Sequence, residues 1–143
     1  MTLIDQMKVI HATNFSFYLK AHFFHWNVEG PFFSQLHELF GNIYEDSFGA
    51  VDKIAEEIRA IKGYAPGSFT RFAQDSKITD QVEVLPAMDM VRALESDNEI
   101  ILRELALGQK AAEDEGEMGL ANFLQDRIDI HKKHGWMLRA TSK

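Results

Sequence analysis

The sequence contains no cysteine among its 143 residues. Disulfide bridges, thiolate metal ligands and thiol catalysis are therefore excluded, and any metal ion would have to be held by histidine, aspartate or glutamate. Proline is also scarce, with three residues, so few positions force a helix to stop. No window approaches the roughly 18 uncharged apolar residues that a membrane span requires.

Basic residues are in the minority. The chain has 15 Lys and Arg against 22 Asp and Glu, which gives a net charge of -7. Only Lys8 is basic among the first ten residues, and Arg139 and Lys143 are the only basic residues of the last five. Because nucleic-acid binders usually carry a basic patch or tail, we expect no DNA binding. The first residues also lack a basic region followed by an apolar run, so we expect a cytoplasmic protein.

Apolar residues recur at helical spacing almost throughout, which predicts an all-α protein with one domain over residues 1–143. Gly30-Pro31 ends the first helix, and Gly63 is expected to cap the second. The expected helices cover about residues 3–28, 33–62, 88–112 and 118–140, with a short helix at 69–73. Four long helices with one long connection between the second and third are typical of a ferritin-like bundle.

The same periodicity assigns side chains to the core or to the surface. His131 falls on the apolar stripe of the last helix, where a buried, hydrogen-bonded histidine is a simpler interpretation than a metal ligand. The stripes place Leu19, Trp26, Phe33 and Phe48 in the core, and leave His11 and His134 on the surface.

Four side chains are candidate metal ligands: His25, His37, Asp52 and Glu56. Because Asp52 lies 15 positions after His37 on one helix, the two are about 22 Å apart and cannot share an ion within one chain. If this helix packs antiparallel against its copy about a twofold axis, His37 faces Glu56 and position 41 faces Asp52. His25 would then complete a pocket of nitrogen and carboxylate ligands of the kind that binds ferrous iron.

Spacing alone does not establish such a site. An acidic residue on a long helix is usually a solvated charge, and a lone histidine more often packs than binds a metal. Under that interpretation the chain is a structural helical bundle without saturable metal binding.

A longer pattern favours the metal site. The run Lys-Ala-His-Phe-Phe-His-Trp-Asn-Val-Glu-Gly-Pro-x-Phe-x-x-Leu-His over residues 20–37, followed by Tyr44, by residues 52–58 and by Trp136-Met137-Leu138, resembles the Dps family of miniferritins. The resemblance covers essentially the whole chain. It implies a hollow dodecamer with ferroxidase sites at twofold interfaces, which oxidises ferrous iron with hydrogen peroxide or dioxygen, stores ferric mineral and protects against oxidative stress. It maps His25, His37, Asp52 and Glu56 onto four of the usual iron ligands.

The sequence departs from that family at two positions. Gly41 stands where the family commonly has an aspartate ligand, and His22 stands where it often has lysine. We therefore predict that His22 is an added ligand that replaces the missing carboxylate. The alternatives are that His22 is a bystander or that His131 is recruited. Zinc is a competitor for such a set of ligands.

The resemblance raises further hypotheses. Glu117 and Asp126 are candidates for carboxylates that line a pore and attract cations, although Glu117 could simply be a solvated turn residue. Trp26 and Tyr44 could donate electrons near the metal or could only pack, and packing is the simpler role for Tyr44. The second class of function in this family is DNA compaction, which depends on basic tails that this sequence lacks.

Overall fold

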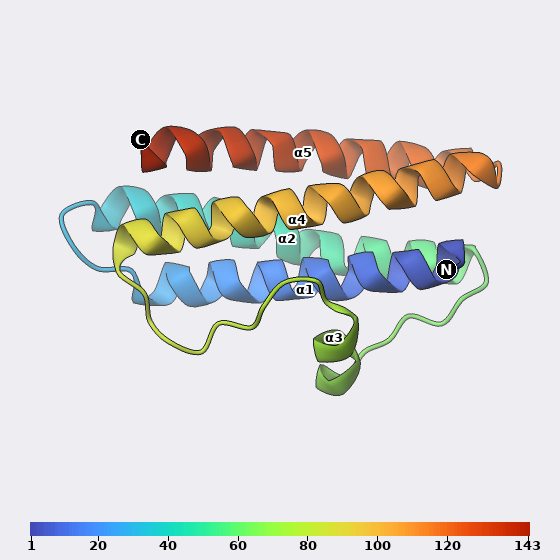
Figure 1. Ribbon diagram of the computed structural model, residues 1–143, viewed down its shortest axis with the longest axis horizontal. Coiled ribbons are helices and arrows are strands. Elements are labelled where there is room, and N and C mark those ends of the chain that lie inside the picture. Colours follow the sequence, from blue (N-terminus) through green and yellow to red (C-terminus); the bar gives the residue numbers. More distant parts are fainter.

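A computed structural model describes all 143 residues, which form five helices and no strand. The helices are α1 (Leu3–Asn27), α2 (Phe33–Ala60), α3 (Phe69–Asp75), α4 (Ala87–Asp114) and α5 (Met118–Ser142). The four long helices lie side by side as a bundle, and α3 packs outside it against α1 (Figure 1). The predicted four-helix architecture, with a short helix in the long connection, is confirmed. No helix combines the length and the apolar character needed to cross a membrane.

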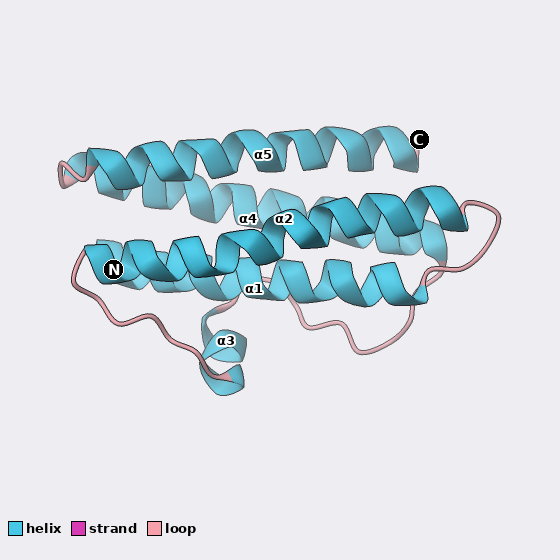
Figure 2. Cartoon of the chain, turned by 180° about the vertical axis from the view of Figure 1, so that it is seen from behind, coloured by secondary structure: helices cyan, strands magenta, loops and turns pink.

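The bundle consists of two antiparallel hairpins. A short loop joins α1 to α2, and another joins α4 to α5, while residues 61–86 run back along the bundle and carry α3 (Figure 1). This long return makes α2 and α4 parallel, and the view from behind shows α2 in front of α4 (Figure 2). The tight loop after α1 places the end of α1 beside the beginning of α2.

Local interactions explain where α1 begins and α2 ends. The Thr2 hydroxyl accepts a hydrogen bond from the Asp5 amide, and the Asp5 carboxylate accepts one from the Thr2 amide, which forms a capping box. The left-handed residue that closes α2 is Lys62, with φ of 75°, rather than the predicted Gly63. Gly63 is needed for a different reason, because an added Cβ would lie 2.8 Å from a methyl group of Ile4.

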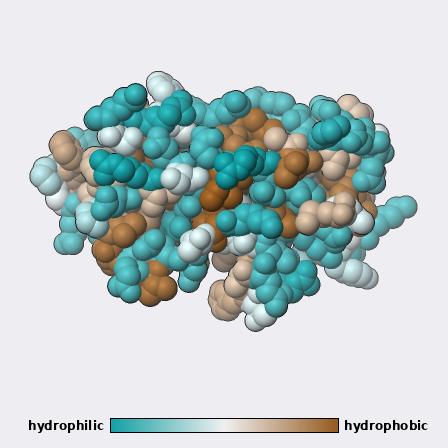
Figure 3. All heavy atoms as spheres, viewed as in Figure 1, coloured by the Kyte–Doolittle hydropathy of each residue, from teal (hydrophilic) through white to brown (hydrophobic).

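Large apolar side chains fill the space between the four long helices. The largest fully buried ones include Phe17, Phe24, Phe40, Met7, Ile54, Met90, Leu94 and Ile101. Leu19, Trp26, Phe33 and Phe48 were predicted for this core, but they are 42 to 58% exposed. The apolar stripes of α1 and α2 are therefore wider than the helix faces that the other helices of the same chain cover. Brown patches also interrupt the otherwise mainly hydrophilic face in Figure 3.

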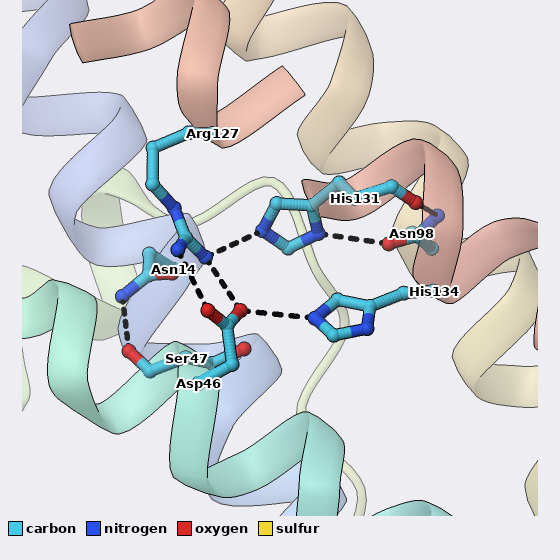
Figure 4. A network of polar contacts seen from close by, with 7 residues as sticks. All are labelled: Asn14, Asp46, Ser47, Asn98, Arg127, His131 and His134. Atoms are coloured by element: carbon cyan, nitrogen blue, oxygen red, sulfur yellow. Dashed lines mark hydrogen bonds and ion pairs between the residues drawn. The ribbon is translucent and has the colours of Figure 1, made fainter. Parts of the chain in front are cut away.

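Two histidines that were predicted on the surface are buried. His11 is 3% exposed and its Nε2–H donates to the Pro66 carbonyl, while His134 is 9% exposed and donates to Asp46. Their partners lie 55 and 88 residues away in the sequence, so helix periodicity alone gave no sign of them. The interpretation of His131 as a buried, hydrogen-bonded histidine is confirmed, since it is fully buried against Asn98 and Arg127 (Figure 4).

Because several histidines are buried, we expect the free energy of unfolding to decrease as the pH falls below about 6.5. Burial lowers the pKa of His131 well below its usual value, and burial likewise lowers the pKa of His11. The unfolded chain therefore binds protons that the folded chain does not, which disfavours folding by up to about 1.4 kcal/mol per pH unit for each histidine. Urea unfolding at pH 7.5, 6.5 and 5.5 measures the effect.

A variant in which His131→Gln removes one of these titrating groups should show a shallower dependence on pH over the same range. Equal stability of the wild-type protein at all three pH values would contradict this account.

Candidate metal centre

The hairpin of α1 and α2 brings His25 and His37 together. His25 lies in the last turn of α1 and His37 in the second turn of α2, and their rings stack with centroids 3.7 Å apart at an interplanar angle of 16°. Each ring also contacts the other residue's backbone. The distance from His25 Nδ1 to the His37 carbonyl oxygen and that from His37 Nδ1 to the His25 carbonyl oxygen are both 2.7 Å.

These reciprocal bonds determine which nitrogen of each ring is free. A carbonyl oxygen can only accept, so Nδ1 must carry the hydrogen in both His25 and His37. The Nε2 atom of each neutral ring then keeps an unshared lone pair, and no protein group bonds to it. A backbone carbonyl on the second nitrogen is the arrangement that orients histidines for metal binding. The hairpin therefore holds two imidazoles in the tautomer that a metal ion requires.

Gly41 lies directly against the His25 ring. A Cβ added at position 41 would be 3.2 Å from both Cε1 and Nδ1 of His25, which is tighter than ordinary van der Waals contact. A Cβ here would require the His25 ring to shift by a few tenths of an ångström. The glycine that removes a carboxylate from the predicted site also makes room for the close approach of the two helices.

His22 lies one turn before His25 and belongs to an aromatic cluster. Its ring stacks on Tyr44 with centroids 3.7 Å apart, and its centroid is 4.0 Å from that of Trp26 and 6.1 Å from that of His25. Its Nδ1 is 3.0 Å from the Tyr18 hydroxyl, which can either donate or accept. When Nδ1 donates, Nε2 of His22 is free to bind a metal.

Burial, and then the charge on His25, lowers the pKa of His22. The ring therefore stays neutral, as a ligand must, to a lower pH than an ordinary histidine does.

The two candidate carboxylates lie near the other end of α2. Asp52 and Glu56 are one turn apart and exposed. Asp52 raises the pKa of Glu56, first through a hydrogen bond and then through its like charge. Two carboxyl groups in such proximity favour binding of a cation, which relieves the repulsion between them.

The structure thus brings together some of the predicted ligands and separates the others. His22, His25 and His37 lie in one cluster. Asp52 and Glu56 lie further along α2, about 22 and 28 Å from His37 by helical rise. No group of three or more histidine and carboxylate side chains in the chain is arranged to hold a metal ion. His131 lies in a separate buried network. Glu117 and Asp126 are exposed at and near the start of α5.

Two features of this centre were missed by analysis of the sequence: the exchange of backbone hydrogen bonds between His25 and His37, and the contact of Gly41 with His25. A signal for both was present, because a short loop between two helices forces antiparallel packing. Residues near the end of the first helix then face residues near the start of the second.

Three comparisons place the chain among known proteins. The ferritin family, described as a ferritin-like domain, matches residues 4–143. DNA protection during starvation protein 2 of Bacillus anthracis is 36% identical over 86% of this chain and 84% of its own length. The crystal structure of a Dps protein from Bacillus brevis superposes with a TM-score of 0.94 at 28% identity, covering 99% of this chain and 95% of that one.

A Dps protein from Vibrio cholerae, described as a member of a broad superfamily of ferritin-like diiron-carboxylate proteins, superposes with the same TM-score at 26% identity. It covers 99% of this chain and 89% of the Vibrio chain. The sequence matches and the structural superpositions both extend over nearly the entire chain. The chain belongs to the Dps family of ferritin-like proteins.

Proposed function

We propose that this protein is a ferroxidase and iron-storage miniferritin, which oxidises Fe(II) at sites shared between two chains. The observation that carries the proposal is the His25–His37 pair, whose Nε2 atoms are left free while both Nδ1 atoms are bonded to backbone carbonyls. Two imidazoles with nearby carboxylates and open positions are a typical environment for ferrous iron. Membership of a ferritin-like family that includes a protein described as diiron-carboxylate supports iron as the metal.

The carboxylates of this site come from a second copy of α2. If two α2 helices pack antiparallel about a twofold axis, His37 of one chain faces Glu56 of the other, and Gly41 faces Asp52. Phe48 supports this packing, because it lies 11 positions, or about three helical turns, after His37 on the same helix face and is 57% exposed. An exposed aromatic at the centre of a helix face favours association.

In this proposal each residue type has a chemical role. His25, His37 and the partner's carboxylates bind Fe(II) as substrate, and His22 supplies a further nitrogen where Gly41 offers no side chain. Hydrogen peroxide accepts two electrons, one from each of two ferrous ions, and is reduced to two hydroxide ions. Dioxygen is the alternative oxidant. Zinc competes for the same nitrogen and oxygen ligands.

The aromatic cluster contributes to this site in two ways. Tyr44 packs on His22 and holds its ring in place. Trp26 is 58% exposed with its ring centroid 4.0 Å from that of His22, so it could donate an electron to the hydroxyl radical that a one-electron reduction of hydrogen peroxide would form.

The assembled form proposed is a hollow dodecamer in the cytoplasm that stores ferric mineral and limits oxidative stress. Glu117 and Asp126, both exposed, would attract ferrous ions toward its pores. DNA binding is not part of this proposal, because the net charge of -7 on each chain repels the phosphate backbone.

The sharing of sites between chains predicts complementation between two inactive variants. His37→Ala and Glu56→Ala should each abolish most peroxide-driven Fe(II) oxidation, followed by ferric absorbance. When the two variants are refolded together, half of the pairs are mixed and each mixed pair contains one intact site, so about a quarter of the wild-type rate should return. Glu38→Ala, an exposed carboxylate on the same helix, is the matched control and should keep the full rate. No recovery on mixing would refute a shared site.

His22 should contribute directly to oxidation. We expect His22→Ala to slow Fe(II) oxidation about tenfold, because the iron loses one nitrogen ligand. Assembly should stay intact, because His22 is one side chain in a large interface. Tyr44→Phe keeps the ring that stacks on His22 and should leave the rate unchanged. If His22→Ala oxidises iron as fast as the wild-type protein, His22 only packs within the aromatic cluster.

The proposed assembly predicts a definite mass in solution. Twelve chains of 16.4 kDa give a particle of about 197 kDa by light scattering. Phe48→Arg, which places a charge on the exposed face of α2, should shift the protein toward smaller species. A wild-type protein that stays monomeric or dimeric at micromolar concentration would contradict the dodecamer.

A further inference from the structure

The centre of the bundle contains a polar network that the proposed iron chemistry does not use (Figure 4). Arg127 and His131 of α5 lie at its middle, with Asp46 of α2 and Asn98 of α4 on either side. Arg127 is 6% exposed and His131 is fully buried. Burying a guanidinium costs free energy unless its N–H groups donate to acceptors. The acceptors around Arg127 therefore show which kind of ion this position favours.

Three lone pairs converge on the Arg127 guanidinium. Asp46 Oδ1 is 2.9 Å from Nη1, Asp46 Oδ2 is 2.8 Å from Nη2, and His131 Nε2 is 3.2 Å from Nη2. Because the guanidinium can only donate, all three atoms must be acceptors. The site therefore combines a carboxylate and an imidazole nitrogen, both directed at one cation.

The opposite side of the His131 ring fixes its tautomer. The Asn98 amide nitrogen donates to the His131 carbonyl at 2.8 Å, which leaves the Asn98 side-chain oxygen to accept from His131 Nδ1–H, also at 2.8 Å. The ring hydrogen is thus on Nδ1, and the lone pair is on Nε2. This arrangement is the one that orients a metal-binding histidine.

Both groups are also held in the charge state of a metal ligand. Burial alone would raise the pKa of Asp46, but hydrogen bonds from His134 and Arg127 outweigh it and hold the pKa of Asp46 well below its usual range. Burial lowers the pKa of His131, so its ring is neutral. Asp46 is thus a carboxylate and His131 a free base at neutral pH.

We propose that the centre of each bundle is a divalent-cation site that the chain fills with its own Arg127 guanidinium. Fe(II) and other divalent metals are thereby excluded from it in the native protein, and a metal enters when the guanidinium is removed. Carboxylate and imidazole are the ligands that Fe(II), Co(II) and Zn(II) share. His134 is a further donor, because its Nε2 is 2.9 Å from Asp46 Oδ2 and can bind a metal in the tautomer that carries the ring hydrogen on Nδ1.

Two unpartnered oxygens lie beside this network (Figure 4). The Asn14 side-chain oxygen and the Ser47 hydroxyl are both fully buried and form no hydrogen bond. Buried polar atoms normally find a partner, so these two are available to a cation or to its bound water. The contacts run to two different guanidinium nitrogens, so the side chains would have to shift to bring their donors within the about 2.0–2.2 Å of a single ion that metal binding needs. In the native arrangement no group of three or more histidine and carboxylate side chains is placed to hold a metal ion.

The test is Co(II) binding by the full chain in which Arg127→Ala. We expect one more Co(II) per chain than in the wild-type protein, with the visible absorption of cobalt bound to nitrogen and oxygen, and a melting temperature that rises with Co(II) concentration. Arg127→Lys is the matched control, because it keeps a cation at this position and should bind no additional cobalt. The double variant with Asp46→Asn should lose the additional cobalt.

Three outcomes would overturn the proposal. Arg127→Ala could fold and bind no more cobalt than the wild-type protein, or the additional cobalt could persist in the double variant with Asp46→Asn. The third is a variant that remains unfolded at saturating Co(II), since a metal in this site should replace the charge that Arg127 supplied. None of these outcomes bears on Fe(II) oxidation at the hairpin, which is measured separately.

Discussion

The length of α2 is the constraint on which the rest of the candidate site depends. A helix of 28 residues keeps its side chains at fixed distances, and those that lie 15 positions apart remain about 22 Å from each other. His37 and Asp52 therefore belong to different sites within any one chain. In the proposed pairing of two α2 helices, each end of α2 would provide half of a ligand set, and the surface between the two halves carries the exposed Phe48.

Much of the fold followed from the sequence because helix periodicity and loop length act locally. The errors arose where a contact between distant segments decided the outcome. The residues next to His134 in the sequence predict that it lies on the surface. In the structure it is buried, and it donates a hydrogen bond to Asp46, 88 positions earlier. The candidate ligands His25 and His37 were found from the sequence, but not their exchange of backbone hydrogen bonds, because this exchange depends on how closely two helices approach at Gly41.

The buried charges have a structural role as well. The helix pairs in close contact are α1 with α2, α4 with α5, and α1 with α4. Arg127 reaches from α5 to Asp46 on α2 and so joins two helices that do not pack closely by themselves. Since a buried pair of charges tolerates little misalignment, this contact favours one relative position of the two hairpins over slightly shifted ones.

The His25–His37 exchange has a thermodynamic consequence. A flexible histidine must lose rotamer freedom when it binds a metal ion, at a cost on the order of 1 kcal/mol per side chain. Here both rings are already fixed by carbonyl oxygens of the facing helix. Their rotamer freedom is therefore lost on folding, before any ion binds. If the proposed ion binds here, its arrival and departure should leave the hairpin unchanged, and the centre would be as ordered without the ion as with it.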